Sequence, residues 1–342
     1  MITLGIAISH NCSASLMIDG KIVGLVQEER LTKIKNQSGF PLKACKALIA
    51  NHLDNNSSLI NEVVFGSKRF HPYGYCLDFY SGYEVQDHIK EMKEVWYPVF
   101  YKNQPLDGEI WKKRYLKNEQ LNKFHNFNFD FINKDISLTE ATEYFSNVEI
   151  FSPIKNLIPN FSNFRKIDHH KCHGYYALYG GELNQNSHED VLVLTADAMG
   201  DEKNWSASIV NKDGTLNRLD YGNDFLLARI YKFCTLILGM KPNEHEYKVM
   251  GLSAYSKSTK HIKIVEDLFF DILDFHDGMF VSKKPLIDSY FDLKNRLEGL
   301  RFDNIAAGLQ NWTSAVIIKW ANYTNPPAVP QFAETKKTST LN

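Results

Sequence analysis

The chain has 342 residues, of which 39 are basic and 40 acidic, so its formal net charge is −1. This balance argues against a broad electrostatic surface for nucleic acid or an anionic membrane, and the length predicts about two domains. There is no apolar run long enough to span a bilayer and no signal-peptide pattern at the N-terminus. The five cysteines are scattered without a CxxC pair. We therefore expect a cytoplasmic protein without a disulfide framework, partnered by neither nucleic acid nor membrane.

The first thirty residues predict three consecutive strands. Apolar and β-branched residues fill 2–9, and a polar turn from His10 to Ser13 separates them from a second strand at 14–18. The dipeptide Asp19-Gly20 is a two-residue hairpin signal, and the third strand covers 21–28.

The following hundred residues combine regular and irregular signals. Helical spacing of apolar residues predicts a helix after Pro41, and residues 62–66 predict a buried strand. Between residues 70 and 131, sixteen of 62 residues are aromatic, which is about double the density of the whole chain. We expect a mainly helical insert here. Its rings either pack against each other structurally or form a lid that faces a substrate.

A second three-strand unit begins near residue 190, and its third strand again follows an Asp-Gly hairpin signal. Its predicted strands cover 190–196, 205–211 and 215–221. Ser206-Ala207-Ser208-Ile209 repeats Ser13-Ala14-Ser15-Leu16, which indicates an internal duplication. Two such units can hold a nucleotide between them, with backbone N–H groups of the polar turns, including the one with Asn11 and Ser13, aimed at phosphates. Plain hairpins are the alternative.

The last third of the chain is predicted to be helical. The predicted helices cover 225–238, 244–254, 260–273 and 302–322. The composition then changes to a proline-rich and threonine-rich stretch without a packing pattern. We expect a disordered tail over 324–342.

The most specific local motif is Asp168-His169-His170-Lys171-Cys172-His173. On a helix, His169 and His173 share one face, where two imidazoles can bind one divalent metal ion. Asp197, at the end of a predicted strand, is our candidate for a third ligand. The alternatives are a solvated or capping histidine cluster and an ordinary turn aspartate.

Further polar residues fit a nucleotide and a transfer reaction. His10 follows the first strand in the same relative place as Asp197, where a histidine can act as general base. Residues 27–35 alternate acids and bases, which is typical of an exposed face or of cations that meet phosphates. Gly251 interrupts a helical pattern, which suggests close packing or ligand approach.

Together these stretches resemble the N-terminal, Kae1-like domain of O-carbamoyltransferases that modify nodulation factors and aminoglycoside or cephalosporin antibiotics. The resemblance covers roughly residues 1–323 and is weakest in the aromatic insert. It rests on Gly5-Ile6, His10-Asn11-Cys12-Ser13-Ala14, Asp19 to Val23, Gln27 to Thr32, Phe40-Pro41, the histidine motif, Asp197 to Gly200, Glu246 to Leu252 and Asn304 to Gln310.

The resemblance implies a fold of the actin/Hsp70/sugar-kinase type with duplicated ribonuclease-H-like lobes. It further implies transfer of a carbamoyl group from carbamoyl-adenylate, made from carbamoyl phosphate and ATP, to a hydroxyl of a small molecule or glycan. By motif, His169, His173 and Asp197 would bind a divalent metal, commonly iron, and His10 would lie near the transferred group. Lys35, Lys248 and Gly251 would lie near the adenylate.

The expected organisation is a first lobe at 1–69, the insert at 70–165, a partial second lobe at 166–323 and the tail. The family's second glycine-rich loop, a further metal-ligating aspartate and the YrdC-like domain that makes the adenylate are not found in this sequence. We therefore expect a truncated transferase lobe, or one subunit that needs a separate YrdC-like partner, with a homodimer as one form. A non-catalytic nucleotide-binding or assembly module and a sugar-kinase-like phosphotransferase are the alternatives.

Overall fold

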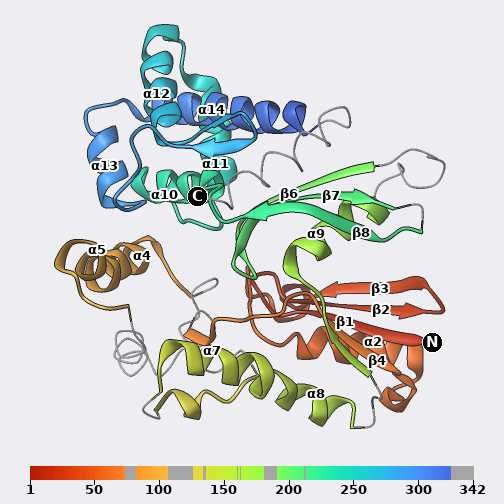
Figure 1. Cartoon of the computed structure of the whole chain (residues 1–342). Helices are drawn as coiled ribbons and strands as arrows, with labels where there is room; N and C mark the ends of the chain where they lie inside the picture. The colour runs from red at the N-terminus through yellow and green to blue at the C-terminus, as the bar shows by residue number, and fades with distance from the viewer. Residues whose placement is uncertain are drawn as a thin grey trace, which may run out of the picture. The chain divides into compact units, whose positions relative to one another are not determined.

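The computed structural model describes residues 1–73, 82–106, 126–133, 136–159, 161, 163–180, 191–211 and 213–324. The fold is mixed α/β and consists of two compact units, Met1–Cys172 and His173–Asn342 (Figure 1). The boundary between the units falls inside one continuous helix, α9 (His169–Gly180). Within the described ranges, no helix is both long and apolar enough to cross a membrane.

The first unit is built on a five-stranded sheet with the order β3-β2-β1-β4-β5. Strands β1 to β3 are antiparallel neighbours, whereas β4 runs parallel to β1 and β5 runs parallel to β4. The four strands predicted in the first seventy residues are confirmed. The strands are β1 (Ile2–Ala7), β2 (Ser13–Ile18), β3 (Lys21–Gln27), β4 (Glu62–Phe65) and β5 (Asn163–Lys166).

Helices complete the first unit, and every regular element described between residues 70 and 162 is helical. The core of the unit includes Leu4, Leu48 and Val63, contributed by β1, α2 and β4. The helices are α1 (Glu28–Thr32), α2 (Leu42–Leu53), α4 (Val85–Glu91), the π-helical η2 (Met92–Trp96), α5 (Tyr97–Lys102), α7 (Leu138–Asn147) and α8 (Ser152–Leu157), with short 3₁₀ turns at Ser57–Leu59, Asp130–Asn133 and Glu149–Phe151.

Glu28 departs from the expectation for the charged segment 27–35, because its side chain is neither exposed nor available to a ligand. It is 1% exposed, and its two carboxylate oxygens accept hydrogen bonds from the backbone N–H groups of Lys43 at 3.0 Å and Ala44 at 2.7 Å. These donors belong to the first turn of α2, and Pro41 before them supplies no side-chain cap. Glu28 therefore caps α2 from a distant point of the chain.

Two thiols lie close to this cap, namely Cys12 and Cys45. Burial and the nearby carboxylate of Glu28 raise the pKa of both, so they stay protonated at neutral pH. Both are free thiols, as are Cys172 and Cys234. Burial and the raised pKa of Cys12 and Cys45 favour a packing role over redox chemistry.

The second unit contains a three-stranded antiparallel sheet with the order β6-β7-β8. The strands are β6 (Val191–Gly200), β7 (Lys203–Val210) and β8 (Leu216–Gly222), as predicted. One correction concerns residues 197–201, which were expected to end the first strand. Strand β6 continues to Gly200, and its pairing with β7 is irregular between Ala196 and Gly200. The residues from Asp197 to Met199 therefore interrupt the ladder without ending the strand.

The repeated tetrapeptides occupy equivalent positions in the two sheets. Ser13–Leu16 pairs antiparallel with Leu4–Ala7, and Ser206–Ile209 pairs in the same register with Leu192–Thr195. In both sheets the strand that carries the repeat is central to a three-stranded meander. The sequence repeat is therefore also a repeat of strand pairing.

Helices and a short hairpin complete the second unit. The four helices predicted there are confirmed, whereas the hairpin β9–β10 and helix α13 were not predicted. Trp312 lies at the core, stacks on Phe269 with ring centroids 5.2 Å apart, and donates its indole N–H to the carbonyl of Leu273. The elements are α10 (Leu227–Ile237), α11 (Glu246–Leu252), a 3₁₀ turn (Ser253–Tyr255), α12 (Thr259–Ile272), β9 (Asp274–His276), β10 (Met279–Val281), α13 (Phe291–Leu297) and α14 (Phe302–Tyr323).

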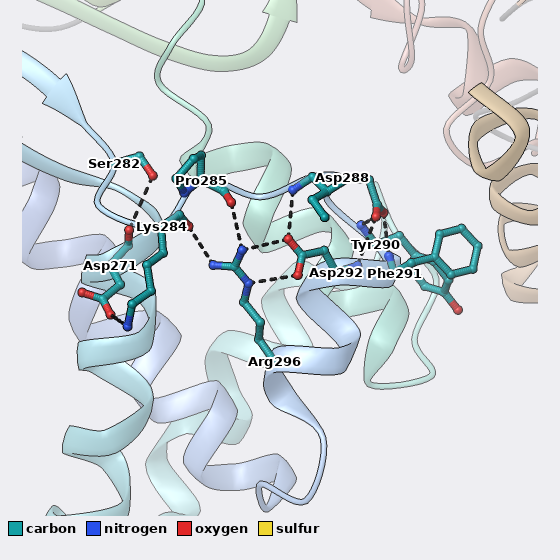
Figure 2. Close-up of polar contacts among 10 residues, drawn as sticks. Asp271, Ser282, Lys284, Pro285, Asp288, Tyr290, Phe291, Asp292 and Arg296 are labelled. Carbon is teal, nitrogen blue, oxygen red and sulfur yellow. Dashed lines mark hydrogen bonds and ion pairs between the residues drawn. The ribbon is translucent and has the colours of Figure 1, made fainter. Parts of the chain in front are cut away.

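The segment between β10 and α13 has no regular structure and is held by a polar clasp (Figure 2). Arg296 donates to the Asp292 carboxylate and to the backbone carbonyls of Lys284 and Pro285. The buried carboxylate of Asp288 accepts hydrogen bonds from three consecutive backbone N–H groups at the start of α13. The side chains of Asp288 and Arg296 thus supply hydrogen-bond partners for backbone groups that no helix or sheet pairs, and Asp288 fixes where α13 begins.

Replacing Asp288 by alanine should lower the free energy of unfolding by about 1–2 kcal/mol, because three N–H groups lose their acceptor. Urea denaturation followed by circular dichroism measures this loss. The exposed acid Asp267, paired with Lys263 on α12, is the matched control, and its alanine variant should change stability by less than about 0.5 kcal/mol. Equal losses in both variants would contradict the capping role of Asp288.

Acid should weaken the same clasp. Burial alone would raise the pKa of Asp292, but hydrogen bonds from Arg296 and from the Ile287 N–H outweigh burial, so the pKa lies below its ordinary value. A carboxyl group whose pKa is lower in the folded state than in the unfolded state stabilises the fold. For an aspartate this stabilisation is fully present at pH values above its unfolded-state pKa of about 3.9. This stabilisation is lost as the pH falls through the lower, folded value. Unfolding measured from pH 6 to pH 3 should show it, and the Asp292→Asn variant should show a shallower loss.

Candidate metal centre

The histidine motif begins helix α9 directly after strand β5. The carboxylate of Asp168 accepts a hydrogen bond from the Lys171 N–H at 3.1 Å, and its carbonyl accepts one from the Cys172 N–H at 3.0 Å. Asp168 therefore caps the helix, whose first residue is His169. Because the helix starts there, His169 and His173 lie one turn apart on the same face, as predicted.

Close packing brings α9 to the β6–β8 sheet. Gly174 lies where an added Cβ would be 3.0 Å from a methyl carbon of Leu216 and 3.5 Å from one of Val193. Leu178 of α9 joins Val193 and Leu216 in a small buried cluster. Asp197 lies four residues after Val193 on the same strand, where the pairing of β6 with β7 becomes irregular.

Ligand atoms of His169, His173 and Asp197 lie close together. Nε2 of His173 lies 3.6 Å from Oδ2 of Asp197, and one ligand atom from each of His169, His173 and Asp197 falls within 4.8 Å of the others. The other carboxylate oxygen of Asp197 accepts a hydrogen bond from the Ala198 N–H at 2.6 Å, which leaves Oδ2 toward His173. His169 and Asp197 are half-buried and His173 is exposed.

This donor set fits a first-row divalent ion. Ligand atoms about 2.1 Å from one ion lie at most about 4.2 Å apart, so the 3.6 Å pair is already compatible with a shared ion. The widest allowed separation of 4.8 Å requires a contraction of several tenths of an ångström. Two imidazole nitrogens and a carboxylate oxygen are suitable ligands for iron, zinc and related ions. The three residues supply three ligands, so water or substrate would complete the coordination.

His170 and Cys172, the two other candidate ligands in the histidine motif, are not part of this cluster of ligand atoms. His170 is 1% exposed, and its ring centroid is 5.6 Å from that of His169 at an interplanar angle of 73°. Cys172 is half-buried, with its sulfur 4.0 Å from the carbonyl of Ile167. Their places on the helix agree with the prediction that only the first and last histidines of the motif share one face.

The first polar turn gathers three further predicted residues, which all belong to the first unit. His10 is exposed, and its Nδ1 lies 3.3 Å from Nδ2 of Asn11. Asn11 has a left-handed φ of 55°, and the half-buried Ser13 begins β2. The structure thus places His10, Asn11 and Ser13 in one turn.

A loop that sequence reasoning missed is hydrogen-bonded to this turn. The Cys12 N–H donates to the carbonyl of Gln37 at 2.8 Å, and the Gly39 N–H donates to the carbonyl of Ile8 at 2.9 Å. Lys35, which is exposed, lies two residues before Gln37. The left-handed Gly39, with a φ of 106°, is the signal in the sequence that could have indicated a tight loop here.

Lys248 and Gly251 lie on the exposed side of helix α11 in the second unit. Close packing was one explanation for a glycine inside this helix, and that explanation is wrong. A Cβ added at Gly251 would meet nothing within 4 Å. The position is open on the surface beside Tyr247, which is 58% exposed.

Replacing Gly251 by alanine should therefore raise the free energy of unfolding by about 0.5–1 kcal/mol, because alanine restricts the unfolded chain and favours helix. Thermal and urea unfolding both measure this gain. Gly299 is the matched control, since its surroundings are equally open but its φ is +79°. Gly299→Ala should destabilise the protein. A loss of stability in Gly251→Ala would mean that the site is more crowded than it is in the structure.

Comparison with known proteins supplies the family. A family model described as carbamoyltransferase N-terminus matches residues 2–328. An uncharacterized protein of Synechocystis sp. is 24% identical over 93% of this chain and 47% of its own length. An uncharacterized protein of Methanocaldococcus jannaschii is 26% identical over 74% of this chain and 33% of its own length. The chain thus spans half or less of the length of these curated relatives. Since the family match covers nearly the whole chain, the protein belongs to the family of carbamoyltransferase N-terminal domains.

Proposed function

We propose that this chain is the transferase part of an O-carbamoyltransferase, which moves a carbamoyl group from carbamoyl-adenylate to a hydroxyl group of a small molecule or glycan. Family membership supports a carbamoyltransferase. The observation that carries the finer proposal is the cluster of His169, His173 and Asp197. A metal ion there would place positive charge where the carbamoyl and phosphate oxygens of an adenylate have to bind.

We further propose that the two sheets belong to a duplicated, ribonuclease-H-like architecture of the actin and sugar-kinase type. The equal register of the repeated tetrapeptides in β2 and β7 supports a common origin of the two meanders. Carbamoyl-adenylate would be made from carbamoyl phosphate and ATP by a YrdC-like domain or subunit. The curated relatives are long enough to contain further domains beside the part matched here.

In this proposal His169, His173 and Asp197 would hold a divalent ion, with iron as our candidate, which would supply Lewis acidity toward the carbamoyl group. The acceptor oxygen bonds to the carbamoyl carbon, and the bond from that carbon to the phosphate oxygen breaks, which releases AMP. His10 takes the acceptor's proton at Nδ1. Because the Asn11 amide nitrogen only donates, Nδ1 carries the lone pair in the neutral ring. The acceptor hydroxyl would replace Asn11 as the donor there.

Our candidate residues for binding the adenylate are Asn11, Ser13 and Lys35 in the first unit and, in the second unit, Lys248 and Gly251 on α11. Lys248 places its ammonium group 5.8 Å from the ring centroid of Tyr247, on the surface next to the open position at Gly251. An ammonium group there can bind a phosphate. The missing Cβ at Gly251 would let a ligand approach the helix backbone.

Calorimetric titration with ADP and AMP tests this assignment. Lys35→Ala and Lys248→Ala should each weaken nucleotide binding at least about tenfold, because each removes a charge-assisted contact. Lys260→Ala, which removes an exposed lysine from α12, should leave binding unchanged. Binding that is equally strong in all three variants would show that these lysines do not contact the nucleotide.

A further inference from the structure

A small apolar pocket lies within the second unit and is lined by the end of α10, by α13 and by the start of α14. Its volume is about 470 Å³, and seven of the ten residues that line it are apolar. An apolar wall with a few polar groups is the usual composition of a small-molecule site. The wall includes Ile237 and Leu238 after and within α10, Phe291 and Leu297 of α13, and Phe302 and Ile305 of α14.

Buried contacts and the polar clasp hold the walls of this pocket in place. Leu297 and Ile305 are buried and belong to the core of the second unit. The Asp288 carboxylate accepts the Phe291 N–H at 2.6 Å, and Arg296 ties α13 to the segment before it (Figure 2). A pocket with fixed walls loses little conformational freedom when a ligand binds.

Two opposite charges line the pocket, namely Lys294 on α13 and Glu298 directly after the helix. Lysine and glutamate four residues apart on a helix can pair with each other. Among the residues that the structure describes, however, neither side chain has a hydrogen-bond or ion-pair partner. The nearby Arg296 and Arg301 already bind aspartates. Lys294 and Glu298 are therefore the charges that a ligand in the pocket can engage.

These two charges select the class of ligand. An apolar anion is repelled by Glu298, and an apolar cation is repelled by Lys294. A neutral apolar ligand would cover both charges without pairing either of them, which costs desolvation. A ligand that has one carboxylate, one ammonium group and an apolar body pairs both side chains. An α-amino acid with a large apolar side chain has these three parts.

We propose that this pocket binds a single free amino acid with a large apolar side chain. Lys294 binds the carboxylate of the ligand, Glu298 binds its ammonium group, and the apolar wall covers its side chain. The volume of about 470 Å³ lies toward the small end of the range for ligand pockets, which favours one amino acid over a peptide or a lipid chain.

The pocket is a site of its own. None of the residues that line it belongs to the candidate metal centre, and none is a candidate for nucleotide binding. The assignment therefore goes beyond the proposed function and does not depend on it. A ligand that binds the folded chain alone stabilises the fold by mass action, so occupancy can be measured without any turnover.

Calorimetric titration of the whole chain with L-phenylalanine, L-leucine and L-tryptophan tests the assignment. At least one of them should bind with a dissociation constant below about 1 mM and should raise the melting temperature. The compounds 3-phenylpropionate and phenethylamine keep the ring of phenylalanine but carry one charge each, so they should bind at least about tenfold more weakly. Lys294→Ala, Glu298→Ala and Glu298→Gln should each weaken amino-acid binding by a similar factor. Lys260→Ala, on the exposed side of α12, is the matched control and should have no effect.

Four results would overturn the assignment. The first is a wild-type chain that binds none of the three amino acids at millimolar concentration. The second is binding that is equally strong in the Lys294 and Glu298 variants, which would place the site elsewhere. The third is 3-phenylpropionate binding as tightly as any amino acid, which would identify a site for apolar anions. The fourth is self-association in light scattering that Phe302→Ala abolishes without any amino-acid binding, which would assign the pocket to a second copy of the chain.

Discussion

Purified protein in which both His169 and His173 are replaced by alanine should retain no stoichiometric divalent metal. The wild-type chain is expected to bind about one ion, because two imidazoles and the Asp197 carboxylate converge. The double variant keeps Asp197 as the single ligand of the three, so its affinity should fall more than about hundredfold. Metal analysis after dialysis, together with titration of iron(II) and zinc into the metal-free chain, measures the loss.

The matched control is His261→Ala, which removes an exposed histidine at the start of α12. It should leave the metal content at the wild-type value, and Asp197→Asn should lower the affinity less than the double variant does. His173 is exposed and His169 is half-buried, so neither substitution opens the core and the fold should survive, with ADP binding as the check. Retention of one tightly bound ion by the double variant would show that the metal lies elsewhere.

Replacing Glu28 by alanine should lower the free energy of unfolding by about 2–4 kcal/mol. The substitution removes the acceptor of the Lys43 and Ala44 N–H groups in a place that is closed to water. Hydrogen bonds to an ionised carboxylate are stronger than neutral ones, and a buried donor without an acceptor carries the full desolvation penalty. Glu28→Gln keeps the shape and one carbonyl oxygen and should lose roughly half as much.

Two measurements separate this effect from general damage. Urea unfolding gives the total loss, and amide hydrogen exchange should show that the Lys43 and Ala44 protons are among those that lose the most protection. Lys46→Ala, on the exposed side of the same helix, should change stability by less than about 0.5 kcal/mol. If Glu28→Ala is no less stable than Lys46→Ala, the capping role is wrong.

Much of the secondary structure could be predicted because its signals are local. The apolar and β-branched runs in β1, β2, β6 and β7 and the spacing of apolar residues in α2, α12 and α14 depend on residues a few positions apart. Short elements such as β9, β10 and α13 carry too few residues for such a pattern, although Asp277-Gly278 between the two strands is an ordinary hairpin signal. The burial of Glu28 was missed because its partners lie 15 and 16 residues away.

The candidate site divides in the same way. The shared face of His169 and His173 follows from helix geometry alone, once Asp168 is recognised as the cap. The approach of Asp197 depends on tertiary packing, in which Gly174 lets α9 approach the sheet and the pairing of β6 becomes irregular after Ala196. For Gly251 the sequence pattern left close packing and ligand approach as explanations, and only the structure could show that the position is open.

The most direct test of the central claim is transfer of the group itself. The chain, loaded with iron(II) or zinc, would be supplied with carbamoyl-adenylate carrying carbon-14 in the carbamoyl group, and with maltotriose, cellotriose or chitotriose as acceptor. We predict a labelled carbamate ester, one AMP released for each ester formed, and no ester with the His169→Ala/His173→Ala variant. Tight binding of metal and nucleotide without any labelled ester, whatever hydroxylated acceptor is offered, would contradict the account and identify a nucleotide-binding module without transferase activity.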